Sequence, residues 1–124
     1  MSVILLVHQR LALAGILITL IIGLWGLITY LRRAPASSGY RSTLVMTEVL
    51  FLAQAVAGIA LFVFGGKRPH DGLHVLYGVL LVIALPIGAS YTSGREPRRE
   101  PLVYGLVGLF MVGLTIRAIT TGGA

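Results

Sequence analysis

The sequence predicts an all-α protein, an integral membrane four-helix bundle with up-down-up-down topology. The mean hydropathy is +0.93, 56% of the residues are hydrophobic and only 11% are charged. A chain of 124 residues cannot hide that much apolar surface in one small water-soluble core. The apolar residues also form four segments of roughly 20 residues or more, the length that an α-helix needs to cross a hydrocarbon layer of about 30 Å. Short polar breaks separate these segments.

The expected membrane spans are residues 3–31, 42–64, 72–91 and 101–121, within a single transmembrane domain of residues 1–124. Strands are not expected, because an open sheet leaves unpaired backbone groups in lipid. Since the breaks are short, successive helices should be antiparallel neighbours. The start of the chain lacks the basic region of a signal peptide, so we expect it to be retained.

Arginine is concentrated in the first and third breaks, residues 32–41 and 91–101, which hold six of the ten basic residues. Lysine and arginine beside a span favour the cytoplasmic side of the membrane. We therefore expect a multi-pass protein of the inner (plasma) membrane with both termini and the second break facing outward. Arg10 and Arg117, near the outward helix ends, weaken the asymmetry to six basic residues against four.

Small residues predict where the helices approach closely. Gly15, Thr19 and Gly23 recur every four residues in the first span, and Gly105 and Gly113 share a stripe on the fourth. Helices in lipid associate through van der Waals contact at such positions. These two stripes are the predicted packing seams.

A proline and several aromatic residues indicate local features of the spans. Pro86 lies inside the third span, where it frees the carbonyl of Val82 and is expected to bend the helix. Aromatic residues near the cytoplasmic ends are expected to form an interfacial belt; these are Trp25, Tyr30, Tyr40 and Tyr91.

Polar residues converge at the outward end of the predicted bundle. They are His8, Arg10, Lys67, Arg68, His70, Asp71, His74 and Arg117. At about 1.5 Å of rise per residue, His8 and His74 both lie roughly 4 to 8 Å below their helix starts. Their imidazoles are thus expected to share one depth on nonadjacent helices, and Asp71 is expected to cap the third helix. The alternative is that both histidines are hydrogen-bonded interfacial side chains.

The residues at this end could bind either a haem or a metal ion. His8 and His74 can ligate a haem iron axially, and Ala12, Gly15 and Gly78 leave space beside them for a flat macrocycle. The candidate cofactor-binding residues are His8, His74, Arg10, Arg68, Arg117 and Tyr77, with the arginines neutralising propionates and Tyr77 near a quinone. For a metal ion the candidates are His8, His74 and His70, because His70 and His74 are spaced i, i+4 and share a face if the helix begins at Pro69.

The histidine-containing four-helix arrangement resembles small membrane b-type cytochromes. The run from Arg68 to Gly78, with Pro86 and Arg117, resembles uncharacterised four-span bacterial membrane proteins. Cytochrome b561-type proteins hold two haems with four histidines, whereas this chain has three histidines, all toward one end. The resemblance therefore implies at most one haem b.

Glu48 and Arg117 lie inside apolar spans, where a charge is costly and usually faces protein or water. Their depths differ too much for them to pair. Glu48 is expected to meet Arg41, Arg95 or another arginine of the third break, or to be protonated by burial; a proton path through Glu48 and Gln54 is the alternative. Arg117 either extends toward the outer interface or anchors an anionic group on a cofactor, quinone or partner.

Composition and motifs exclude several functions and leave three open. The chain has no cysteine, so disulfides and thiolate metal sites are excluded. It lacks the basic groove with exposed aromatics that nucleic-acid binding requires, and no catalytic motif is present. We expect an accessory or assembly subunit of a larger membrane complex, partnered by lipid and by other subunits or copies of itself. A single-haem electron-transfer protein and a small transporter or channel are the alternatives.

Overall fold

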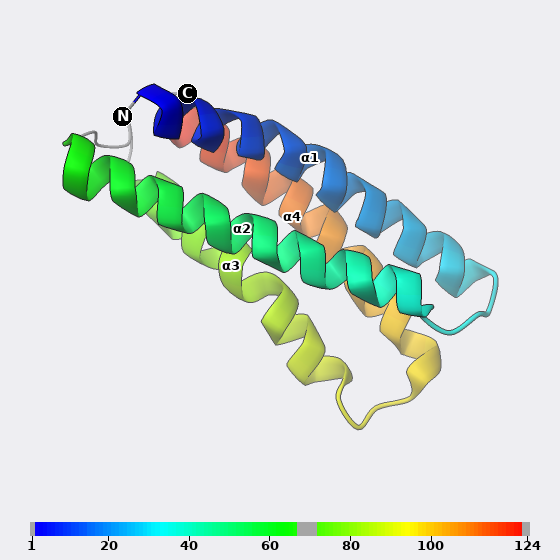
Figure 1. The fold of residues 1–124 in the computed structure, drawn as a ribbon. Helices are drawn as coiled ribbons and strands as arrows, with labels where there is room; N and C mark the ends of the chain where they lie inside the picture. The colour runs from blue at the N-terminus through cyan, green and yellow to red at the C-terminus, as the bar shows by residue number, and fades with distance from the viewer. Residues whose placement is uncertain (1, 67–71, 123–124) are drawn as a thin grey trace.

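A computed structural model describes residues 2–66 and 72–122 and shows four long helices in this part of the chain (Figure 1). The helices are α1 (Ser2–Leu31), α2 (Ser38–Gly65), α3 (Leu73–Thr92) and α4 (Glu100–Gly122), and a 3₁₀ helix, η1 (Pro97–Arg99), precedes α4. Each long helix is long and apolar enough to cross a membrane. No strand occurs among these residues. The predicted all-α membrane bundle is therefore confirmed.

The helices run antiparallel along a single elongated bundle (Figure 1). The start of α1 and the end of α4 lie at one end, called here the histidine end, where His8 and His74 meet. The α1–α2 and α3–α4 connections lie at the other end, called the arginine end. The contact between α1 and α4 is the most extensive and that between α2 and α3 the smallest of the neighbouring pairs. The α1–α4 pair is thus the central unit to which α2 and α3 attach.

Glycine allows α1 and α4 to approach at backbone distance. A Cβ atom at Gly108 would lie 2.7 Å from the backbone nitrogen of Gly23. A Cβ atom at Gly105 would lie 2.8 Å from the backbone nitrogen of Leu27, and one at Gly26 would lie 2.8 Å from Cα of Gly105. Helices in lipid gain van der Waals contact through such close approach. Gly23 and Gly105, predicted to lie at seams, do so.

The other predicted seam residues differ in their roles. Gly113 is exposed, and nothing lies within 4 Å of a Cβ placed there, so its assignment to the α4 seam is wrong. It lies five residues beyond Gly108, which turns it away from the face that Gly105 and Gly108 share. Gly15 is buried, but its nearest neighbour is α2, because a Cβ atom at Gly15 would lie 3.1 Å from the ring of Phe51 and 3.6 Å from the side chain of Thr115 on α4.

Tyr40 anchors the arginine end of the core. It is fully buried, its hydroxyl donates to the carbonyl of Ile22 at 2.8 Å, and its ring packs edge-on against Trp25 with centroids 5.1 Å apart. The prediction that Tyr40 belongs to an interfacial belt in a loop is wrong. The Ser37 hydroxyl accepts from the Tyr40 backbone N–H and caps α2, so the helix begins at Ser38, four residues before the expected span.

Buried threonine hydroxyls elsewhere in the core form their hydrogen bonds within their own helices. Four threonine hydroxyls each donate to the carbonyl four residues earlier, at 2.7 to 2.8 Å: Thr19, Thr47, Thr115 and Thr121. Such bonds occupy the hydroxyl donor without an interhelical partner. The core is therefore held together mainly by apolar packing around Ile22, Phe51 and Met111.

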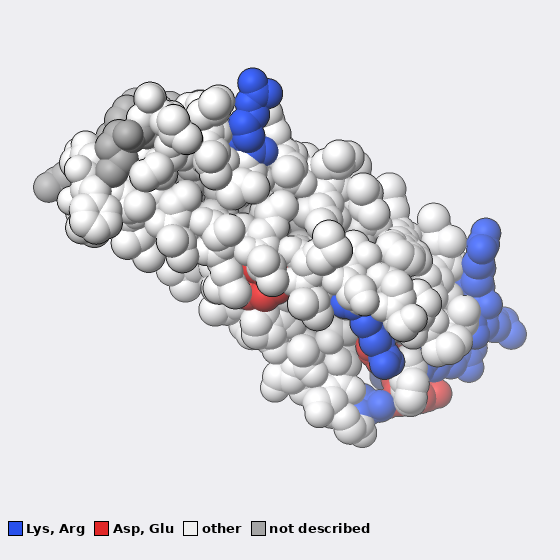
Figure 2. Space-filling view, in the orientation of Figure 1, with Lys and Arg blue, Asp and Glu red and all other residues white. Residues whose placement is uncertain are grey.

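Basic side chains gather at the arginine end (Figure 2). The described residues of this group are Arg32, Arg33, Arg41, Arg95, Arg98 and Arg99. Arg41 makes a two-bond ion pair with Glu100, with N to O distances of 3.1 and 3.0 Å. Arg41, one of several partners expected for Glu48, is therefore the wrong one, because the carboxylate of Glu100 occupies its guanidinium. One carboxyl oxygen of Glu48 is buried without a hydrogen-bond partner, and its protonation stays a prediction.

Helix α3 attaches loosely to α2. Pro86 lies inside α3, which remains helical through it, and Figure 1 shows α3 diverging from α2 toward Thr92. Asp71, the expected N-cap of α3, lies outside the described residues. Gly72 occupies the cap position and makes no side-chain cap bond.

Replacement of Gly108 by alanine should destabilise the bundle by about 1 to 3 kcal/mol, the usual cost of adding a methyl group to a filled interface. The new Cβ would meet the Gly23 backbone, which cannot rotate away. Gly113→Ala is the matched control on the same helix and should be neutral or stabilising by up to about 1 kcal/mol. Thermal unfolding in detergent measures both variants. Equal midpoints for the two would contradict the glycine seam.

Candidate functional site

The imidazoles of His8 and His74 come together at the histidine end of the bundle. His8 lies in the second turn of α1 and His74 in the first turn of α3. Their ring centres are 6.1 Å apart and their planes are inclined at 71°. Both side chains are partly buried. Two histidines that are far apart in the sequence thus share one depth.

Helix α4 fixes the orientation of His74. Nδ1 of His74 lies 2.6 Å from the carbonyl oxygen of Ala118. A carbonyl oxygen only accepts hydrogen bonds, so Nδ1 carries the proton and donates it. In a neutral imidazole the second nitrogen, Nε2, then keeps its lone pair. This is the arrangement in which a histidine commonly binds a metal through Nε2.

Helix α2 holds the backbone beside His8. Nε2 of the Gln54 amide donates to the carbonyl oxygen of His8 at 2.7 Å. Nδ1 of His8 and Oε1 of Gln54 are both buried without a hydrogen-bond partner. Each such atom costs about 1 to 3 kcal/mol. A hydrogen bond from Nδ1–H of His8 to Oε1 of Gln54 would satisfy both atoms and leave Nε2 of His8 free, as at His74.

Two glycines that the sequence analysis missed lie against the rings. A Cβ at Gly58 would lie 3.2 Å from Cε1 of His8, and a Cβ at Gly122 would lie 2.8 Å from Nδ1 of His74. The signal for both was present: Gly58 follows Gln54 by four residues, and Gly122 follows Ala118 by four, which puts each pair on one helix face. The expected small neighbours act differently, since Gly15 packs against Phe51 and Gly78 has nothing within 4 Å.

The remaining candidate residues divide into three groups. The guanidinium carbon of Arg117 lies 5.7 Å from the ring centre of Tyr77, which is one turn after His74. These two side chains therefore form a cationic edge near the imidazole pair. Arg10 is exposed. The candidate cofactor-binding residue Arg68 and the candidate metal ligand His70 lie outside the described residues.

The donor set distinguishes between kinds of metal site. Within residues 2–66 and 72–122, no group of three or more histidine, cysteine or carboxylate side chains is placed to hold a metal ion. A structural zinc ion needs four protein ligands and a catalytic zinc ion three, and the imidazole pair supplies two. A haem iron already has four porphyrin nitrogens and needs only axial ligands from protein. The pair thus fits haem in ligand number.

The separation of the rings also fits haem. When two imidazoles bind on opposite sides of one metal ion, each through a nitrogen about 2 Å away, their ring centres lie roughly 6 Å apart. The observed separation is 6.1 Å. The described residues of this chain therefore supply two imidazoles whose ring separation matches that of two ligands on opposite sides of one iron.

Comparison of the chain with protein-family models, with curated proteins and with solved structures finds no match.

The hydrogen bond to Ala118 predicts the tautomer of His74 in the protein alone. The neutral ring of His74 should carry its proton on Nδ1, because the Ala118 carbonyl accepts from that atom. A hydrogen bond between Nδ1–H of His8 and the unpartnered Oε1 of Gln54 would give His8 the same tautomer, and Gln54→Leu should then shift His8, but not His74, toward the Nε2–H form. ¹⁵N NMR of histidine-labelled protein in micelles distinguishes the two forms. An unchanged His8 spectrum in Gln54→Leu would show that the glutamine does not set its proton.

Proposed function

We propose that the protein is a small multi-pass inner-membrane electron-transfer protein that binds one haem b through His8 and His74. The observation that supports this most is the pair of imidazoles with ring centres 6.1 Å apart and no third ligand group among the described residues. Bound haem would supply reversible one-electron chemistry at its iron. His8 and His74 would hold it through their ring nitrogens.

The surrounding residues would hold the donors in place. Ala118 keeps the His74 proton on Nδ1, and Gln54 fixes the backbone of His8. A hydrogen bond from the ring, such as the one from His74 to Ala118, orients an imidazole and raises its basicity as a ligand. Arg117 lies one residue before Ala118 and over Tyr77, where it is suited to pair with an anionic propionate. A quinone or a protein partner would exchange electrons at this edge.

A second candidate is an accessory or assembly subunit of a larger membrane complex, or a homo-oligomer. The described connections are short, residues 32–37 at one turn and 93–99 at the other. Any partner must therefore bind mainly to the lipid-facing helix surfaces or to the two ends of the bundle. Electron transfer also requires a partner, so the two proposals are compatible. Transport is less favoured, because the buried threonine hydroxyls donate within their own helices.

The proposed orientation places both termini outside the cell membrane. It rests on the six arginines in and beside the two connections at the opposite end of the bundle, where Figure 2 shows basic side chains gathered, because basic residues beside spans favour the cytoplasm. The histidine end, and any haem there, would then lie toward the outer face.

The orientation can be tested by cysteine labelling, since the natural chain has no cysteine. Ser2→Cys should react with a membrane-impermeant maleimide in intact cells. Ser38→Cys and Ser93→Cys, at the arginine end, should react only after the membrane is opened. The reverse pattern would place the termini in the cytoplasm.

Haem binding can be tested in protein produced with ample haem. The purified wild type should show a Soret band, a shift on reduction and one haem per chain, and His8→Ala should lose the bis-imidazole spectrum. His74→Asn should lose it too, although the asparagine amide can still donate to the Ala118 carbonyl and preserve the α3–α4 contact. Folding is checked by circular dichroism.

His70→Ala is the control for this experiment. Under the proposal it keeps the spectrum, whereas a site built from His70 and His74 would lose it. A folded wild type with no Soret band, or a His74→Asn variant with the wild-type spectrum, would rule out the haem site.

A further inference from the structure

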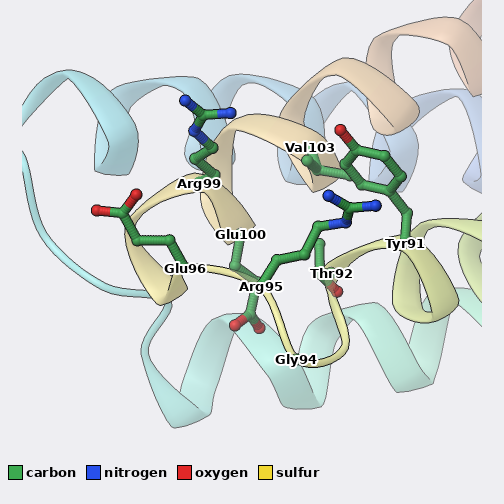
Figure 3. Close-up of a pocket in the computed structure, with 8 residues that line it drawn as sticks. All are labelled: Tyr91, Thr92, Gly94, Arg95, Glu96, Arg99, Glu100 and Val103. Carbon is green, nitrogen blue, oxygen red and sulfur yellow. The ribbon is translucent and has the colours of Figure 1, made fainter.

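Two adjoining hollows lie at the arginine end, far from the histidine pair. The first has a volume of about 320 Å³ and is bordered by Tyr91, Arg95 and Arg99 (Figure 3). The second has a volume of about 520 Å³ and is bordered by Tyr30 of α1 and by four apolar residues of α4, which are Leu102, Val103, Leu106 and Val107. Tyr91, Arg99 and Val103 border both hollows. The two therefore form one continuous depression that is polar at its outer part and apolar deeper along the helices.

The polar part carries unneutralised positive charge. The guanidinium of Arg95 lies 4.4 Å from the ring centre of Tyr91. Glu100 borders the same hollow, but its carboxylate is paired with Arg41. Figure 3 shows the Glu96 carboxylate pointing away from Arg95. Neither Arg95 nor Arg99 forms an ion pair within the described ranges of the chain, so both guanidinium groups are available to an anion.

The position of the depression identifies the kind of anion. Tyr30 and Tyr91 lie where α1 and α3 end, the level of the membrane interface at which tyrosine is enriched. Below them the apolar hollow runs along α4 within the membrane-spanning length. Basic pockets between membrane helices bind anionic lipid headgroups. A ligand that matches both parts has a phosphate at one end and an acyl chain at the other.

We propose that this depression binds one anionic phospholipid. The phosphate would lie in the polar part of the depression, which Arg95 and Arg99 border, and an acyl chain would lie against Leu102, Leu106 and Val107. The proposal is independent of haem, because no residue of the depression belongs to the histidine end. It also gives the arginine end a role in addition to setting orientation.

The test compares two double variants that remove the same charge. Delipidated protein in a neutral detergent is titrated with phosphatidylglycerol or with phosphatidylcholine of the same chains, and bound lipid is counted by native mass spectrometry. The wild type should bind one phosphatidylglycerol in preference to phosphatidylcholine. Arg95→Gln with Arg99→Gln should weaken that binding roughly thirtyfold, from about fivefold for each guanidinium removed from the bound phosphate.

Arg32→Gln with Arg98→Gln is the matched control. These two arginines lie at the same end, are exposed and do not border either hollow. The control should change binding less than threefold. If both double variants lose binding equally, the effect is general surface charge and the proposed site is wrong. Equal binding of the two lipids by the wild type would also overturn it.

A third variant separates a lipid from a free anion. Leu106 is about half exposed, so Leu106→Trp can fill the apolar hollow without a clash in the core. It should weaken phosphatidylglycerol binding and leave the weak binding of water-soluble glycerol phosphate unchanged. Wild-type protein that binds glycerol phosphate as tightly as phosphatidylglycerol would show that the site takes a free phosphate, which contradicts the proposal.

Discussion

The structure depends on the close approach of α1 and α4. Glycines 23 and 26 face glycines 105 and 108, and added side chains there would meet backbone atoms within 3 Å. In lipid no hydrophobic force drives helices together, so the contact relies on close van der Waals packing. Helices α2 and α3 then attach on either side, and they touch each other little. The packing of α1 against α4 consequently sets how deep the residues of these two helices lie in the bundle, including His8 and the Ala118 carbonyl.

Much of the architecture could be predicted from the sequence because lipid limits the choice of structure. Continuous apolar segments of the right length must be helices, and short breaks make neighbours antiparallel. The common depth of His8 and His74 also follows from counting residues along two helices. Residue counting cannot show which way a side chain faces. Spacing alone predicts a seam position for Gly113, which lies on an exposed face.

The errors involve polar groups whose partners are distant in the sequence. The neighbours of Tyr40 in the chain are typical of a loop, but a hydrogen bond to Ile22 buries its side chain completely. Proximity in the chain favours Glu48 as the partner of Arg41, but Arg41 pairs with Glu100, which is 59 positions away. Such pairs of residues become neighbours only when the helices pack together, so the sequence alone does not identify them. The carbonyl of Ala118 could not be identified for the same reason, since every residue has one.

The two imidazoles are held by different means, which has consequences for the site. The acceptor for His74 is a backbone carbonyl, so substitution at position 118 leaves it in place, and Gly122 has no side chain to displace the ring. Gln54 instead donates to the backbone carbonyl of His8, and both its side-chain oxygen and Nδ1 of His8 are unpartnered in the described structure. A side-chain acceptor can be changed or rotated, whereas a helix carbonyl cannot. The ring of His8 is therefore less constrained than that of His74, and Gln54 is the neighbouring side chain through which the proposed site could be tuned.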